Sequence, residues 1–161
     1  MPYLIDGNNL LGSWGGPAIR GDGRAEVVRR VAEFCRARGA RAILVFDGAP
    51  FRPELGDQDL GRLKIRFPAE GKDADSVIRE TVDEAERPGE IVVVTSDRAL
   101  YSYAKTRGAS VLRAHEWNAL ASGAGPALRG RRAAATAGEK PERETDVEGW
   151  LERFSDRPPR R

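Results

Sequence analysis

Cysteine and histidine are scarce in this 161-residue chain, which has one residue of each. The single cysteine, Cys35, excludes an internal disulfide, and its place on the apolar stripe of an expected helix indicates a buried structural thiol. The single histidine, His115, cannot form a histidine metal cluster, and no serine or cysteine nucleophile motif lies beside it. We therefore expect a structural role for His115.

Long apolar runs and nucleotide-binding motifs are also missing. No run approaches the roughly 18 apolar residues that span a bilayer, and the start of the chain leads straight into a short strand without a signal peptide. We therefore expect a cytoplasmic protein that makes no membrane contact. Neither a P-loop nor a GxGxxG pattern occurs, which disfavours an enzyme with a nucleotide cofactor.

Charge of neither sign dominates the composition. The chain has 27 lysine and arginine residues against 25 aspartate and glutamate residues, a net charge of +2. With 40% hydrophobic residues, it has enough apolar material for one ordinary domain and a tail. Arginine suits phosphate binding, but this balance alone supports nucleic-acid binding only weakly.

Apolar runs typical of strands alternate with amphipathic helical patterns over residues 1–121. The helical patterns end near Gly39, Gly89 and Gly108, since glycine commonly follows the last turn of a helix. This alternation predicts an α/β domain with a mostly parallel central sheet. The expected strands are 3–5, 42–46, 63–67, 91–95 and 110–112, and a glycine-rich loop is expected over 12–23.

The last forty residues differ from this domain. Residues 122–143 are rich in glycine, alanine and arginine and lack apolar periodicity, as a linker or arm does. Residues 144–161 begin with a capping-box pattern, carry apolar residues at helical spacing and end in a basic tail. We expect this amphipathic helix to dock back on the domain, with a partner protein as the alternative.

Four aspartates lie at the ends of strand-like runs or at the start of a helix. Asp6, Asp47 and Asp97 follow apolar runs, and Asp75 opens an expected helix. In open α/β sheets, ligands collect at the carboxyl ends of the strands. Carboxylates gathered there repel one another unless a hard cation lies between them. The pattern therefore predicts a site for Mg²⁺ or Mn²⁺, which prefer oxygen ligands.

Two polar neighbours complete this predicted site. A tight turn at Gly7 would let the side chains of Asp6 and Asn9 converge, and Ser96 would orient Asp97 or cap the following helix. Each residue also has a purely structural alternative. Aspartates at these positions commonly cap helices, and the asparagines that follow Gly7 can make turn hydrogen bonds instead.

The same residues resemble a known family. Segments 3–12 (YLIDGNNLLG), 45–47 (VFD), 72–75 (KDAD) and 94–97 (VTSD) are similar, in order and spacing, to the NYN domain of the YacP-like group. That group belongs to the PIN-like ribonuclease superfamily. The resemblance covers about the first 120 residues, and the combination of segments is much more specific than any one of them.

The resemblance implies a three-layer α/β sandwich of PIN-like, Rossmann-like type that carries a metal-dependent endoribonuclease centre. Asp6, Asp75 and Asp97 would be metal-binding carboxylates, and Asp47 a further member. Asn9 matches the asparagine of the Asp-Gly-x-Asn motif of the family, and Ser96 belongs to its Ser-Asp pair. The resemblance also offers messenger RNA cleaved on the ribosome as one option. The glycine-rich segment after residue 122 departs from the long basic helical region of the group.

The leading hypothesis is an endonuclease for single-stranded RNA, in which a metal-activated water attacks a phosphodiester. Single-stranded RNA can thread past fixed metals and stack its bases on aromatic rings. Trp14 and Phe51, on expected loops near the acidic edge, are the candidates for stacking. The candidates for phosphate contacts are Arg52, Lys64, Arg66, Lys72 and Arg98.

Two other functions stay open at this point. One is a non-catalytic RNA- or ribosome-binding protein of the same fold, which the complete set of acidic positions disfavours. The other is a Mg²⁺-dependent phosphatase, which would want an Asp-x-Asp nucleophile motif after the first strand. The sequence at that place is Asp6-Gly7-Asn8, without the second carboxylate.

Overall fold

The computed structural model describes residues 2–14, 23–48 and 57–123. In these ranges the strands are β1 (Pro2–Asp6), β2 (Arg41–Val45), β3 (Gln58–Leu60), β4 (Leu63–Arg66), β5 (Val92–Val94) and β6 (Ser110–Leu112). The α-helices are α1 (Gly7–Ser13), α2 (Arg24–Arg38), α3 (Ala74–Glu84), α4 (Arg98–Thr106) and α5 (Ala114–Ala121), and a short 3-10 helix, η2, spans Pro88–Glu90. The expected linker and terminal helix beyond residue 123 lie outside these ranges.

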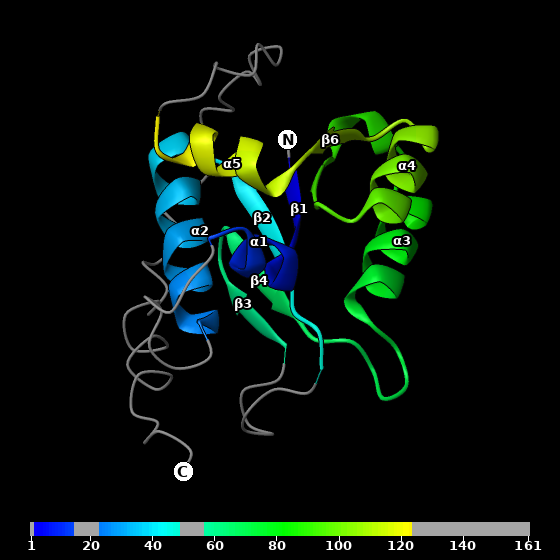
Figure 1. Ribbon diagram of the computed structural model, residues 1–161, viewed down its shortest axis with the longest axis horizontal. Coiled ribbons are helices and arrows are strands. Elements are labelled where there is room, and N and C mark those ends of the chain that lie inside the picture. The colour runs from blue at the N-terminus through cyan, green and yellow to red at the C-terminus, as the bar shows by residue number, and fades with distance from the viewer. Residues whose placement is uncertain (1, 15–22, 49–56, 124–161) are drawn as a thin grey trace.

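The six strands form one sheet in the order β3-β4-β2-β1-β5-β6. Every neighbouring pair is parallel except β3 and β4, which are antiparallel. Helices α1, α2 and α5 cover one face of this sheet, and α3 and α4 cover the other (Figure 1). The predicted α/β sandwich with a mostly parallel sheet is therefore confirmed.

Alternation along the central strand β1 divides the core between the two faces. Ile5 packs in the cluster beneath α2 and α5, whereas Leu4 packs with Ile78 and Leu100 beneath α3 and α4. Successive side chains of a strand point to opposite faces, so a strand covered on both sides must be apolar throughout. The predicted buried thiol of Cys35 lies in the first of these clusters, and burial raises its pKa to about 11.

Three elements differ from the expectations. The chain enters α1 directly after Asp6 instead of making a tight turn, and α1 extends through Ser13 where the glycine-rich loop was expected to begin. Strand β3 pairs with β4 across a turn at Gly61, and α5 follows the last strand. Within the described ranges, no helix is long and apolar enough to cross a membrane.

Gly7 is required by close packing rather than by turn geometry. It is the first residue of α1, and a Cβ atom built on it would lie 2.6 Å from two ring carbons of Phe46. Phe46 is 1% exposed, so its ring cannot move into solvent. The end of β1 can thus turn into α1 only where the side chain is a single hydrogen atom.

We predict that Gly7→Ala lowers the free energy of unfolding by about 1–3 kcal/mol, the usual cost of overpacking a core. The matched control is Gly12→Ala in the same helix, where a new Cβ would meet no atom within 4 Å. That substitution should raise the stability by about 0.5–1 kcal/mol, because alanine loses less backbone entropy in a helix. Urea unfolding measures both; equal effects of the two substitutions would contradict the packing argument.

Candidate functional site

The predicted acidic residues gather at the carboxyl edge of the sheet. Asp6 ends β1, Asp47 follows β2, and Asp97 follows β5. The chain runs from β1 to β2 on one side and later returns to β5 on the other side of β1 (Figure 1). In open α/β sheets, such a reversal of strand order is the place where ligands bind.

Asp6 is the most buried acidic side chain of this edge, with 5% of its surface exposed. Its Oδ2 atom accepts a hydrogen bond of 2.7 Å from the side-chain amide of Asn9, and its Oδ1 atom accepts one of 3.2 Å from the Asn9 backbone N–H. Burial raises the pKa of Asp6 and the Asp47 carboxylate raises it further, while the Asn9 bonds oppose both. The predicted convergence of Asp6 and Asn9 is confirmed.

Asn9 also connects β1 to the end of β5. Its side-chain oxygen accepts a hydrogen bond of 3.3 Å from the backbone N–H of Ser96, while its amide donates to Asp6. The Ser96 hydroxyl in turn accepts a hydrogen bond of 3.2 Å from the backbone N–H of Ala114 at the start of α5. Ser96 therefore anchors α5 in addition to preceding Asp97.

Asp47 is held from three sides by contacts between different elements. Its backbone N–H donates to the side chain of Asn8 over 3.1 Å, and its carbonyl accepts a hydrogen bond of 3.0 Å from Arg24. Its Oδ1 atom accepts a hydrogen bond of 2.7 Å from the backbone N–H of Ala74, the first residue of α3. Asp47 thus joins the end of β2 to the helix that carries Asp75.

Asn8 and Arg24 are edge residues that the sequence reasoning missed. For Asn8 the sequence analysis gave only turn hydrogen bonds, as an alternative, but its partner, Asp47, is 39 residues away. The Arg24 guanidinium lies 5.6 Å from the ring centroid of Phe46 and 5.9 Å from that of Phe67. No local pattern signals such contacts, because each depends on how β2 and β4 are placed in the sheet.

Asp97 and Asp75 are more exposed and have their own partners. Asp97 caps α4, where its Oδ1 atom accepts a hydrogen bond of 2.8 Å from the backbone N–H of Leu100. Asp75 lies in the first turn of α3 and forms an ion pair of 2.5 Å with Arg79. Asp73, two residues before Asp75, is the N-cap of α3 and accepts a hydrogen bond of 2.8 Å from the backbone N–H of Ser76.

The donor chemistry of this edge fits a hard divalent cation, since carboxylate and amide oxygens are the ligands that Mg²⁺ and Mn²⁺ prefer. The positions of these side chains do not yet form a complete set of metal ligands. Among the residues that the structure describes, no three acidic, histidine or cysteine side chains lie close enough together to hold a metal ion. Asp75 and Asp97 would have to exchange their present partners, Arg79 and the α4 N-terminus, to join Asp6.

The predicted phosphate-binding residues have varied surroundings. Lys64 lies 3.6 Å from Asp59 across the β3-β4 pair, and Lys72 forms an ion pair of 2.6 Å with Glu80. The Arg66 guanidinium donates to the carbonyls of Gln58 and Ile65. Arg98 is exposed directly after Asp97. Two further candidates, Phe51 and Arg52, lie outside the described residues.

Trp14, a candidate for base stacking, lies directly at the end of α1. It is the C-cap residue of α1, and its indole N–H donates a hydrogen bond of 2.7 Å to the side chain of Asn118. The Arg30 guanidinium lies 4.2 Å from the centroid of its ring. Trp14 therefore fastens α1 to α5 and is already stacked on a cation.

A mostly parallel α/β sheet with aspartates at its carboxyl edge is the architecture expected of a PIN-like NYN domain, and comparisons with known proteins agree. Residues 3–145 match the family described as the YacP-like NYN domain, so the chain belongs to that family. This family is a ribonuclease family, and the chain has its fold. No curated protein matches the sequence.

Solved structures of Rae1 (YacP) from Bacillus subtilis are similar to this chain. One superimposes with a TM-score of 0.62 at 25% identity and covers 77% of this chain and 75% of its own. The W164L mutant superimposes with a TM-score of 0.60 at 24% identity and covers 76% of each chain. The predicted family and fold are therefore both confirmed.

The buried Asp6 carboxyl gives a prediction about pH. Because its pKa is raised in the folded protein, Asp6 stabilises the fold most below its unfolded pKa, and this contribution falls as pH rises through the folded pKa. We expect the stability of the Asp6→Asn protein, relative to the unaltered protein, to rise as pH is raised from about 4 to about 7. Urea unfolding at a series of pH values measures this difference.

The control for that prediction is Asp73→Asn, which should have the opposite pH dependence. Hydrogen bonds from Ser76 lower the pKa of Asp73, so its contribution is present above the unfolded pKa and is lost as pH falls through the folded pKa. A stability difference of the same sign and pH dependence in both variants would show that burial does not govern Asp6.

Proposed function

We propose that this protein is a metal-dependent endoribonuclease that cleaves single-stranded RNA at the carboxyl edge of its sheet. The observation that carries the proposal is a carboxylate, Asp6, which is 5% exposed at the reversal of strand order in a domain of the YacP-like NYN family. Burial raises the pKa of Asp6 and the Asp47 carboxylate raises it further, so a cation between the two carboxylates would stabilise their charged forms.

Asp6 and Asp47 would hold the ion, and Asp75 and Asp97 would complete its ligands. Bound Mg²⁺ or Mn²⁺ would supply a water of lowered pKa to attack the phosphorus and would polarise a phosphoryl oxygen on that phosphorus, while the ester oxygen on the other side leaves. Asn9 keeps the Asp6 carboxylate in one orientation through its side-chain amide and its backbone N–H. Asn8 and Ala74 hold the backbone and the carboxylate of Asp47.

Two basic residues of the edge would contact the phosphates of the RNA. Arg98 is exposed and follows Asp97 directly, so a phosphate close to the Asp97 carboxylate lies within its reach. Arg24 is fixed against Phe46 and Phe67 and donates to the Asp47 carbonyl, next to the expected ion. Arginine suits this role because its planar guanidinium donates several hydrogen bonds to phosphate oxygens.

A non-catalytic RNA-binding protein is the second candidate, and one observation favours it. Among the described residues no group of three ligands is close enough to hold an ion, and Asp75 is paired with Arg79. Such a protein would bind RNA equally well with or without divalent ions and would not cleave it. The two candidates therefore differ in a single assay.

The test is incubation of the purified chain with end-labelled single-stranded RNA, in Mn²⁺ or in EDTA. We expect cleavage in Mn²⁺ only, and we expect Asp6→Asn and Asp97→Asn each to reduce the rate by at least about a hundredfold, because each removes a metal ligand. RNA affinity should be unchanged or higher in both variants, since each loses a negative charge.

Asp83→Asn is the matched control for these variants. Asp83 accepts a hydrogen bond from the Tyr103 hydroxyl and pairs with Arg107, at the opposite end of α3 from Asp75. Its loss should leave cleavage unchanged. Cleavage that persists in EDTA, or that survives Asp6→Asn, would refute the metal-dependent reaction, whereas metal-independent RNA binding without cleavage would establish the second candidate.

A further inference from the structure

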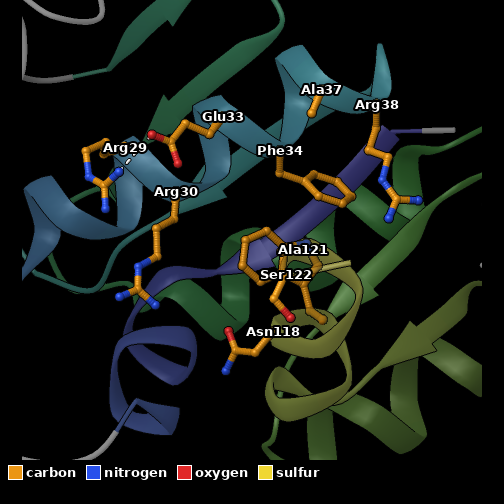
Figure 2. A pocket seen from close by; sticks show the side chains of 10 residues that line it. Arg29, Arg30, Glu33, Phe34, Ala37, Arg38, Asn118, Ala121 and Ser122 are labelled. Atoms are coloured by element: carbon orange, nitrogen blue, oxygen red, sulfur yellow. Dashed lines mark hydrogen bonds and ion pairs between the residues drawn. The ribbon is translucent and has the colours of Figure 1, made fainter. Parts of the chain in front are cut away.

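A groove between α2 and α5 lies outside the acidic edge and has a volume of about 380 Å³ (Figure 2). This size is typical of ligand-binding clefts. Its walls come from residues far apart in the sequence, which the α2 and α5 packing brings together. The lining residues are Arg29, Arg30, Glu33, Phe34, Ala37, Arg38, Trp117, Asn118, Ala121 and Ser122.

The groove is positively charged, with three arginines against one glutamate. Arg29 is already neutralised by ion pairs of 2.6 Å with Glu26 and 2.7 Å with Glu33, and Arg30 shares Glu26 through an ion pair of 2.8 Å. Arg38 is exposed and donates to the carbonyl of Leu120, and it meets no carboxylate among the residues that the structure describes. Arg38 therefore keeps its full charge available for an anion.

The spacing of the basic side chains suits an extended anion. Arg30 and Arg38 are eight residues apart on α2, which places them about 12 Å apart along the helix axis. Figure 2 shows Phe34 between the two side chains, and Arg30 extends toward α1 whereas Arg38 donates to a carbonyl of α5. Successive phosphates of one extended strand can contact two arginines spaced along a helix in this way.

The end of the groove that contains Arg30 and Asn118 contacts α1, and α1 begins at the acidic edge. Asn118, in the groove wall, accepts from the indole of Trp14 and donates to the hydroxyl of Ser13. Arg30 stacks on Trp14, the C-cap of α1, and Asp6 caps the other end of the same helix. With seven residues, α1 is only about 10 Å long. A strand that crosses the edge can thus continue into the groove within a few nucleotides.

Trp117 in the groove wall has an unsatisfied donor. Its indole N–H is buried and has no acceptor among the described residues. A buried donor without an acceptor costs free energy, and native proteins leave few of them.

We propose that the α2/α5 groove binds the sugar-phosphate backbone of single-stranded RNA beside the bond that is cut. This inference rests on the proposed function and adds a second contact region to it, with Arg38 as the principal phosphate ligand and Arg30 as the link to the edge. The groove makes RNA affinity depend on strand length, because a strand that ends at the acidic edge cannot reach Arg38.

The test measures the affinity of the full chain carrying Asp97→Asn for fluorescent single-stranded RNA of about 16 nucleotides, over a series of salt concentrations. Adding Arg38→Ala should reduce the slope of log affinity against log salt by about 0.7, the value for one lost phosphate contact on a single strand. At about 0.1 M salt this corresponds to an affinity about fivefold weaker. Arg38→Lys should restore most of the slope, because it restores the charge.

The matched control is Arg36→Ala, which removes the same charge from the same helix at an exposed position outside the groove. It should leave the slope unchanged. An equal decrease in slope for Arg36→Ala and Arg38→Ala would overturn the proposal, because the effect would then come from net charge and not from the groove. An unchanged slope for Arg38→Ala would overturn it too and would leave the groove to a protein partner or to another part of this chain.

A parallel measurement separates this inference from the proposed function. The chain without the Asp97→Asn substitution is assayed for Mn²⁺-dependent cleavage of the same RNA. Cleavage combined with an unchanged slope for Arg38→Ala refutes the groove alone. Failure to cleave the RNA refutes the proposed function itself, while a reduced slope for Arg38→Ala would still establish the groove as an RNA-binding region.

Discussion

The hydrogen bonds between Asp6 and Asn9 are the interaction on which the edge of this protein depends. They keep a carboxylate buried at the end of the central strand, where its negative charge is disfavoured by the loss of water. Asn9 uses its remaining oxygen on Ser96, so one side chain holds the end of β1 against the end of β5. Both side chains come from the start of one short helix, since Asp6 is the N-cap of α1 and Asn9 lies in its first turn.

Other contacts extend this constraint around the edge. Asn8 holds Asp47 at the end of β2, and Asp47 holds the first turn of α3. The edge is therefore a set of strand and helix ends connected through polar side chains and backbone groups. Such rigid support is what a reaction centre needs, because reacting groups must be positioned before the substrate arrives. Helix α1 begins with Gly7 because a larger side chain at this position would collide with the ring of Phe46.

All strands except β3 were predictable, because they are short apolar runs or, in β4, alternate apolar and basic residues, whereas the sequence of β3 is Gln-Asp-Leu. The positions of the aspartates followed from where the apolar runs end. Helix α1 was not predictable from periodicity, since seven residues with two glycines and two asparagines are a poor helix sequence. It forms because Asp6 caps it and Leu10 is buried beneath it. The pairing of Asp75 with Arg79 has ordinary i,i+4 spacing and could have been expected. The stacking of Arg30 on Trp14 has no such local signal.

The central claim is that the carboxyl edge captures a divalent ion through Asp6, and the most direct measurement is a Mn²⁺ titration followed by backbone amide NMR. The account predicts that small amounts of Mn²⁺ broaden the signals of Asn9 and Ser96 first, that excess Mg²⁺ reverses the broadening, and that Asp6→Asn abolishes it. Broadening centred on another part of the molecule, or persisting unchanged in Asp6→Asn, would contradict it.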